Sequence, residues 1–158
     1  MEKYGGLNYT MLCDFYELTM GNGYFEAGLG EKITYFDLFY RTVPDNGGFA
    51  IAAGVGQGGG YIRDLHFSEE GISYLRGRGM FSESFLDYLR HFKFTGDVWA
   101  MPEGTPVFPR EPIMVIRAPA IQAQLLETFL LLTINCLIVS NHFLIQRTFL
   151  LMLFLRFF

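Results

Sequence analysis

The chain has 158 residues, of which 51% are hydrophobic and 18% charged, a composition that excludes an intrinsically disordered protein. Its formal net charge is −4, with 16 acidic against 12 basic residues, so no excess of positive charge attracts nucleic acid. Aromatic residues make up 17% of the chain, and so many rings are expected to be buried in a core, an interface or a membrane.

The first predicted element is a helix over residues 10–29. Thr10 is placed to cap its start and Gly28 to end it. Two internal glycines weaken its middle, at roughly 1 kcal/mol each against alanine. The apolar spacing predicts a buried stripe, with Phe15 and Phe25 beside it, made of Leu12, Tyr16, Met20 and Tyr24.

A strand is predicted next, over residues 33–41, where β-branched and aromatic residues point to both faces. Bulky residues on both faces are typical of a strand that is covered on both sides. Residues 45–48 have the composition of a sharp turn. The apolar run Phe49–Ala53 is then either a short strand or the entry to a helix.

Two short helices are predicted over residues 68–78 and 82–92. Each begins with a serine followed by acid, Ser68 and Ser82, which suits a capped and negatively charged first turn. Their apolar positions predict buried side chains at Ile72, Leu75, Phe85, Leu86 and Leu89.

From residue 96 the pattern changes to short strands over residues 97–101, 107–108 and 113–117, interrupted by prolines that confine them to a small β unit. A helix that is apolar almost all round begins at residue 121. All 16 acidic residues lie at or before Glu127, whereas residues 136–158 contain no acid, Gly or Pro. This break in composition sets residues 136–158 apart from the rest of the chain.

Gly54 to Gly59 satisfy the pattern GxGxxG, which is found where backbone N–H groups approach a pyrophosphate. The second strand and later acid of a dinucleotide site do not follow, so we favour a glycine-weakened helix entry. His66, His91 and His142 lack the spacing of metal ligands. Cys13 is expected to be a small buried hydrophobic residue of the first helix, not a nucleophile.

Five segments, in order, resemble bacterial nicotinate phosphoribosyltransferases. They are LCDFYELTMGNGYFEAG (12–28), FDLFYR (36–41), GGFAIAAG (47–54), FTGDVWAMPEGTPVFPREP (94–112) and APAIQAQLLETFLLLTIN (118–135). The resemblance implies an α/β fold class: the α+β N-terminal domain of a type II phosphoribosyltransferase over residues 1–120, with only the start of the α/β barrel at 121–135.

The resemblance also implies a reaction. Members of this family join nicotinate to phosphoribosyl pyrophosphate, giving nicotinate mononucleotide for NAD biosynthesis. They use ATP and Mg²⁺, form a phosphohistidine, and are usually homodimers with a shared active site. Tyr16 matches the tyrosine that lies at the nicotinate site of the family, where a phenol ring can stack on a pyridine ring; the spacing alone favours a core ring.

Weaker site candidates are Asp14, Thr19 and Arg41. The Arg41 guanidinium could bind a carboxylate or phosphate, or could form an ion pair at the strand end. Glu103 is expected to be structural because its neighbours mark a turn. No residue is assigned as catalytic, because the phosphohistidine element of the family, G-T-x-x-H-S, is absent from this sequence.

The tail over residues 136–158 departs from the family and is expected to come from a frameshift or a mis-called gene end, leaving an inactive fragment. Two rival hypotheses are a non-catalytic partner of the full-length enzyme, docking through its aromatic helix, and a small membrane-anchored protein. The second rests on 19 uncharged residues, Thr128–Gln146, which polar side chains interrupt. Met1–Leu12 has no signal-peptide pattern, so the expected location is the cytoplasm.

Overall fold

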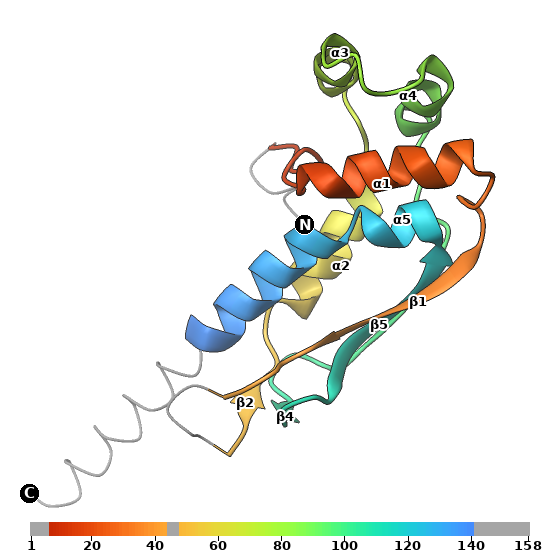
Figure 1. Cartoon of the computed structure of the whole chain (residues 1–158). Helices are drawn as coiled ribbons and strands as arrows, with labels where there is room; N and C mark the ends of the chain where they lie inside the picture. The colour runs from red at the N-terminus through yellow and green to blue at the C-terminus, as the bar shows by residue number, and fades with distance from the viewer. Residues whose placement is uncertain (1–6, 44–47, 141–158) are drawn as a thin grey trace, which may run out of the picture.

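The computed structural model describes residues 7–43 and 48–140 of the chain (Figure 1). The elements are α1 (Phe15–Glu26), β1 (Ile33–Phe39), β2 (Ala50–Ile51), α2 (Val55–Asp64), α3 (Glu69–Gly77), α4 (Glu83–Arg90), β3 (Asp97–Ala100), β4 (Pro106–Val107), β5 (Pro112–Pro119) and α5 (Ala120–Gln124). After a turn at residues 125–126 the chain is helical again over residues 127–140. This mixture of helices and strands confirms the predicted α/β class.

The main sheet has three antiparallel strands in the order β1-β5-β3. Ile116 of β5 pairs with Phe36 on one side and with Val98 on the other. The predicted strands after residue 96 are therefore confirmed, and the last of them, β5, lies between the first, β3, and the distant β1. Strands β2 and β4 form a separate two-stranded sheet. Residues 45–47 of the predicted turn lie outside the described residues.

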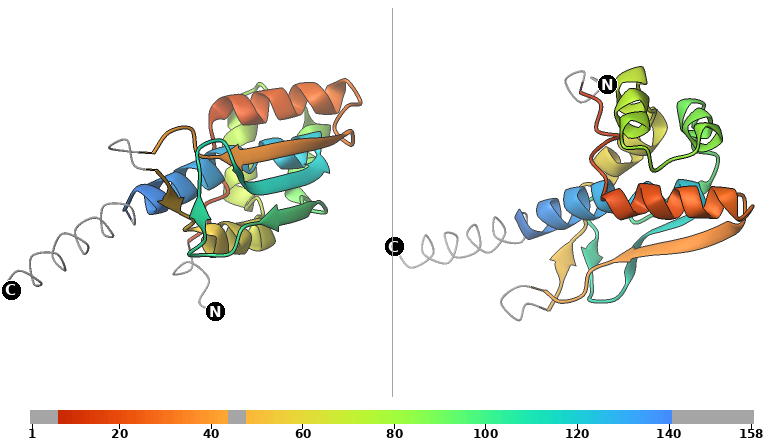
Figure 2. Two further views of the ribbon diagram at one scale, coloured as in Figure 1. Left: turned by 90° about the horizontal axis from the view of Figure 1, so that it is seen from below. Right: turned by 45° about the horizontal axis from the view of Figure 1, so that its top comes forward.

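The prediction that β1 is covered on both sides is wrong. Burial alternates along β1, with Leu38 buried and Tyr35 66% exposed. On β3, Trp99 is 54% exposed. The reason is visible in Figure 2, where the helices lie on one side of the main sheet only. Among the described residues, the other face of the sheet has no covering layer.

Helix α5 is the centre of the helical layer, because it contacts α1, β1 and β5 (Figure 1). Helix α1 is shorter than predicted: its N-cap is Asp14 and its C-cap Ala27, while Gly28 follows in the left-handed conformation with φ 68°. Thr10 does not cap it. Instead, the buried Thr10 hydroxyl accepts the His66 backbone N–H at 3.2 Å.

The stripe predicted to be buried on α1 is in fact partly exposed. Leu12, Phe15, Tyr16 and Met20 are 40–45% exposed. The inward positions are Glu17, Leu18 and Gly21. A Cβ at Gly21 would lie 3.4 Å from Phe85 and 3.6 Å from Ile121. This glycine, which the sequence marks as a weak point, therefore gives α1 its close approach to α4 and α5.

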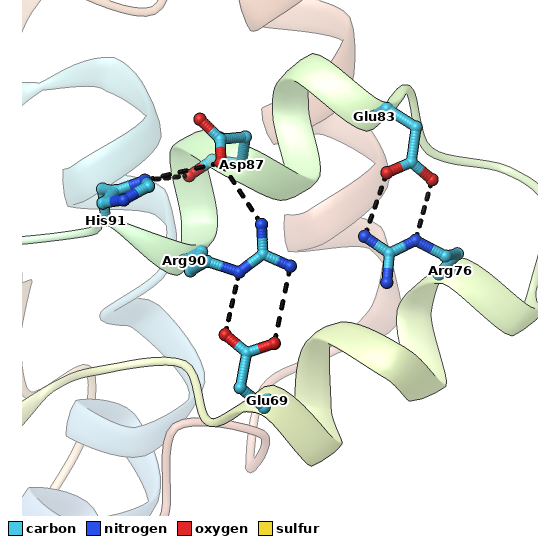
Figure 3. Close-up of polar contacts among 6 residues, drawn as sticks. All are labelled: Glu69, Arg76, Glu83, Asp87, Arg90 and His91. Atoms are coloured by element: carbon cyan, nitrogen blue, oxygen red, sulfur yellow. Dashed lines mark hydrogen bonds and ion pairs between the residues drawn. The ribbon is translucent and has the colours of Figure 1, made fainter.

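Helices α3 and α4 form a pair as predicted. The Ser68 hydroxyl accepts the Gly71 N–H and the Ser82 hydroxyl accepts the Phe85 N–H, so both predicted caps are confirmed. The five predicted core side chains are fully buried. On the outer surface the carboxylate of Glu83 binds Arg76, and that of Glu69 binds Arg90, each at 2.8 Å in its shorter contact (Figure 3).

Among the described residues, the helical stretch Ala120–Ser140, which includes the turn at residues 125–126, is long and apolar enough to cross a membrane, and 44% of its apolar window is buried inside the protein. The core helix of a soluble protein meets the same criteria. Ile134 and Ile138 are fully buried in the hydrophobic core. This helix is therefore weak support for a membrane anchor. Residues 141–146 of the uncharged run, like most of the tail, lie outside the described residues.

Two glycines give the first prediction. A Cβ at Gly96 would lie 2.5 Å from the Arg117 backbone oxygen and 2.6 Å from the Ala118 Cβ, so Gly96→Ala should lower the free energy of unfolding by about 1–3 kcal/mol. Gly23 lies within α1 with nothing near its Cβ position, so Gly23→Ala should raise it by about 0.5–1 kcal/mol. Urea unfolding measures the free energy of unfolding of each variant. Equal changes in Gly96→Ala and Gly23→Ala would contradict the packing around Gly96.

Candidate functional site

A pocket of about 240 Å³ opens between the main sheet and the helical segment that follows it. Its walls are mostly apolar side chains of β1, β5 and residues 123–131. Three of its lining residues are ionisable: Asp37, Arg41 and Glu127. An apolar pocket with a few charged groups is the usual form of a small-molecule site. Of the three ionisable groups, the Arg41 guanidinium can bind an anionic group, whereas the other two are carboxyl groups.

Tyr16 lies beside this pocket through its contact with Glu127. Glu127 lines the pocket, and its side chain is near enough to Tyr16 to affect the ionisation of the phenol. Burial, followed by the effect of the nearby Glu127, raises the pKa of Tyr16 to about 12. The ring itself is 43% exposed. Tyr16 is thus available for a ligand and is not the core ring that its spacing alone predicted.

The weaker candidates are placed differently. Arg41 lines the pocket, and no ion pair to Arg41 is found within residues 7–43 and 48–140. Thr19 donates its hydroxyl hydrogen to the backbone oxygen of Tyr16 at 3.1 Å, one turn back along α1. Asp14 is the exposed N-cap of α1, and its N–H donates to the Thr128 hydroxyl at 3.1 Å. Of the three, Arg41 is the best placed to meet a ligand.

Sequence reasoning missed Glu17, the most unusual charged group in the described part of the chain. Its side chain is 0% exposed. One carboxylate oxygen accepts the Thr128 N–H at 3.0 Å and the Thr128 hydroxyl at 2.5 Å, while the other has no hydrogen-bond partner among the described residues. Burial raises the pKa of Glu17, and the nearby Glu127 and Asp14 add to this effect, whereas the bonds from Thr128 oppose it.

The glycine-rich motif forms no phosphate loop. Gly54 has φ 86° and precedes α2, whose first turns contain the remaining glycines. The Gly56 N–H donates to the Glu103 carboxylate at 2.8 Å, so a side chain of the protein already occupies this helix start. A Cβ at Gly58 would lie 2.8 Å from Leu130. The motif is therefore a helix entry, as we favoured, and Glu103 has the structural role expected of it.

Cysteine and histidine side chains add no reactive group to the pocket. Cys13 precedes α1 instead of lying on it, and burial raises the pKa of its thiol to about 12. His66 and His91 are exposed, each with Nδ1 within 2.9 Å of a backbone oxygen, and Figure 3 shows the contact of His91 with Asp87. His142 lies outside the described residues. No group of three potential ligands that could hold a metal ion occurs in the described ranges.

Comparison with known proteins identifies a matching family and several relatives. Residues 11–135 match the family model of the nicotinate phosphoribosyltransferase N-terminal domain. The chain is 41% identical over 122 residues to the nicotinate phosphoribosyltransferase pncB2 of Mycobacterium tuberculosis and 39% identical over 126 residues to the Bacillus subtilis nicotinate phosphoribosyltransferase. These alignments cover 77% and 80% of this chain but 26% of each relative. The chain thus spans about a quarter of the length of the curated relatives it matches.

Solved structures agree with this assignment. The crystal structure of human nicotinic acid phosphoribosyltransferase superposes with a TM-score of 0.71 at 32% identity, over 77% of this chain and 25% of the human chain. A nicotinate-nucleotide pyrophosphorylase from Pyrococcus furiosus superposes with a TM-score of 0.54 at 20% identity, over 85% of this chain and 28% of that one. The latter similarity supports the fold alone.

The raised pKa of Glu17 gives a pH-dependent prediction. A carboxyl whose pKa is raised by folding stabilises the folded state fully below its unfolded value, about 4.3, and this contribution is lost as the pH rises through the folded value. Glu17→Gln should remove that decline while keeping an acceptor for Thr128. Urea unfolding over a pH series measures it. Glu70→Gln, at an exposed carboxylate, is the matched control, and an unchanged slope for Glu17→Gln would refute the prediction.

Proposed function

The chain belongs to the nicotinate phosphoribosyltransferase family, and on this basis we propose that it serves the joining of nicotinate to phosphoribosyl pyrophosphate in NAD biosynthesis. The observation that carries the proposal is the pocket lined by Arg41 and Glu127. Tyr16 is a neighbour of Glu127 and therefore lies near this pocket. These three residues lie within the segment that matches the family model. The apolar walls suit a pyridine ring, and the guanidinium suits a carboxylate.

In this proposal, Tyr16 contacts the nicotinate ring and Arg41 the nicotinate carboxylate. The partly exposed ring of Tyr16 can stack on a pyridine without any rearrangement of the core. The reaction with phosphoribosyl pyrophosphate is proposed for an enzyme of full family length, which we expect to be homodimeric and cytoplasmic. ATP and Mg²⁺ are expected from the family. The described residues do not fit a metal ion, since they contain no suitable group of ligands, so we derive no step through it.

Catalysis by this chain alone is not expected, because its sequence lacks the family's G-T-x-x-H-S element. Binding of nicotinate is therefore the direct test, and saturation-transfer NMR and calorimetry measure it. Tyr16→Ala should weaken binding about threefold to tenfold, the worth of one ring stack, whereas Tyr16→Phe should retain most of it. Tyr74→Ala, at an exposed tyrosine of α3, is the control. Absence of nicotinate binding to the unmodified chain would contradict the proposal.

A second candidate function, a non-catalytic partner of a full-length family enzyme, is favoured by the exposed apolar face of α1. This face comprises Phe15, Tyr16 and Met20, and Leu12 lies just before the helix; each of the four is 40–45% exposed. Partly exposed large apolar side chains on one helix face are typical of a docking surface.

Co-expression with a full-length enzyme and size-exclusion chromatography distinguish the two candidates. The docking function predicts co-elution that the double change Phe15→Ser and Met20→Ser abolishes. Matched changes at Tyr74 and Met80, which are exposed elsewhere, should leave co-elution intact. A chain that never co-elutes with the full-length enzyme would remove this candidate.

A further inference from the structure

A buried polar contact joins α1 to the helical segment 127–140. The Glu17 carboxylate accepts two hydrogen bonds from Thr128, at 3.0 Å from the backbone N–H and 2.5 Å from the hydroxyl oxygen. The same hydroxyl oxygen accepts the N–H of Asp14 at 3.1 Å. One threonine side chain thus holds the N-cap and the first turn of α1. The residues that it joins are more than 110 positions apart in sequence.

The contacts of α1 with this segment come as two neighbouring pairs. Glu17 follows Tyr16 on α1, and Thr128 follows Glu127 on the facing segment. The inner pair, Glu17 with Thr128, is buried, and the outer pair, Tyr16 with Glu127, lies at the pocket. Successive residues on a helix differ by about 100° in direction and 1.5 Å in rise. A rotation or slide that broke the inner pair would therefore also separate the outer pair.

The inner pair is an expensive way to hold two helices together. A buried carboxyl with one oxygen unpartnered among the described residues carries a desolvation cost that an apolar side chain of equal size would avoid. Hydrogen bonds are directional, however, whereas apolar contacts tolerate rotation and slippage. A polar pair in this place fixes the register of α1 more strictly than its stability requires.

We propose that Glu17 and Thr128 are positioning residues of the candidate site, which fix α1 on the segment 127–140 and so hold Tyr16 beside Glu127 at the pocket. This inference rests on the proposed function only in treating Tyr16 as a ligand-binding residue. The geometry that it concerns exists without any ligand, and it can be measured without one.

The central test replaces the Thr128 hydroxyl while keeping the shape of the side chain. Ionisation of Tyr16 is followed by NMR of Cζ-labelled tyrosine, with the resonance assigned through Tyr16→Phe. In Thr128→Val the Tyr16 pKa should fall below its value in the unmodified chain, because the raising effect of Glu127 is lost while that of burial, the largest cause, remains. Thr128→Ser restores the hydroxyl and should restore the value. Thr34→Val, which removes a 3.1 Å bond to the Ala118 oxygen, is the matched control.

Should Thr128→Val fail to fold, a second pair of variants gives the answer. Glu17→Met and Glu17→Gln both remove the carboxylate charge, but only glutamine keeps an acceptor for Thr128. The Tyr16 pKa should therefore be lower in Glu17→Met than in Glu17→Gln. Replacement of a buried charge by an apolar side chain of similar volume is often neutral or stabilising, so the methionine variant is expected to fold.

The outcomes separate this inference from the proposed function. The positioning role is overturned if Thr128→Val folds and its Tyr16 has the same pKa as in the unmodified chain. It is likewise overturned if the Tyr16 pKa is equal in Glu17→Met and Glu17→Gln. A shifted Tyr16 pKa together with weakened nicotinate binding in Thr128→Val, both restored in Thr128→Ser, supports it. If Tyr16 shifts as expected while the unmodified chain binds no nicotinate, the positioning role stands and only the proposed function fails.

Discussion

The hydrogen bonds between Glu17 and Thr128 join the first helix of the chain to the helical segment 127–140, and the proposed position of Tyr16 at the pocket depends on them. The inner side of helix α1 combines the buried Leu18 with the Glu17 carboxylate and Gly21. Its outer side keeps the large apolar groups. A specific polar contact and a close backbone approach therefore add to the apolar packing of Leu18, Tyr24 and Phe25 in orienting this helix.

Local signals in the sequence predicted local structure well. Ser68 and Ser82 predicted the starts of α3 and α4 because a cap involves only the next three residues. Burial on α1 and β1 was predicted wrongly because it depends on partners that are distant in the sequence. The rule that bulky residues lie inward assumes a partner on that side. Which side of β1 receives α5 is decided by pairing with β5, about 80 residues away in the chain.

In the candidate site, too, some residues could be predicted from the sequence and others depend on contacts between distant segments. Family motifs pointed to Tyr16 and Arg41, and both lie at or beside the pocket. No spacing rule could have paired Glu17 with Thr128, or Tyr16 with Glu127, because each pair joins two elements that meet only in the folded chain. The predicted buried stripe of this helix did not include Glu17, so the sequence carried no signal for a buried carboxyl there.

The uncovered face of the main sheet has a spectroscopic consequence. Trp99 is the single tryptophan of the chain and lies half in water on β3, away from the pocket. Its indole emission is therefore a built-in reporter for this face alone. A blue shift reads out the arrival of a second layer on the sheet, whichever molecule supplies it, with no label attached.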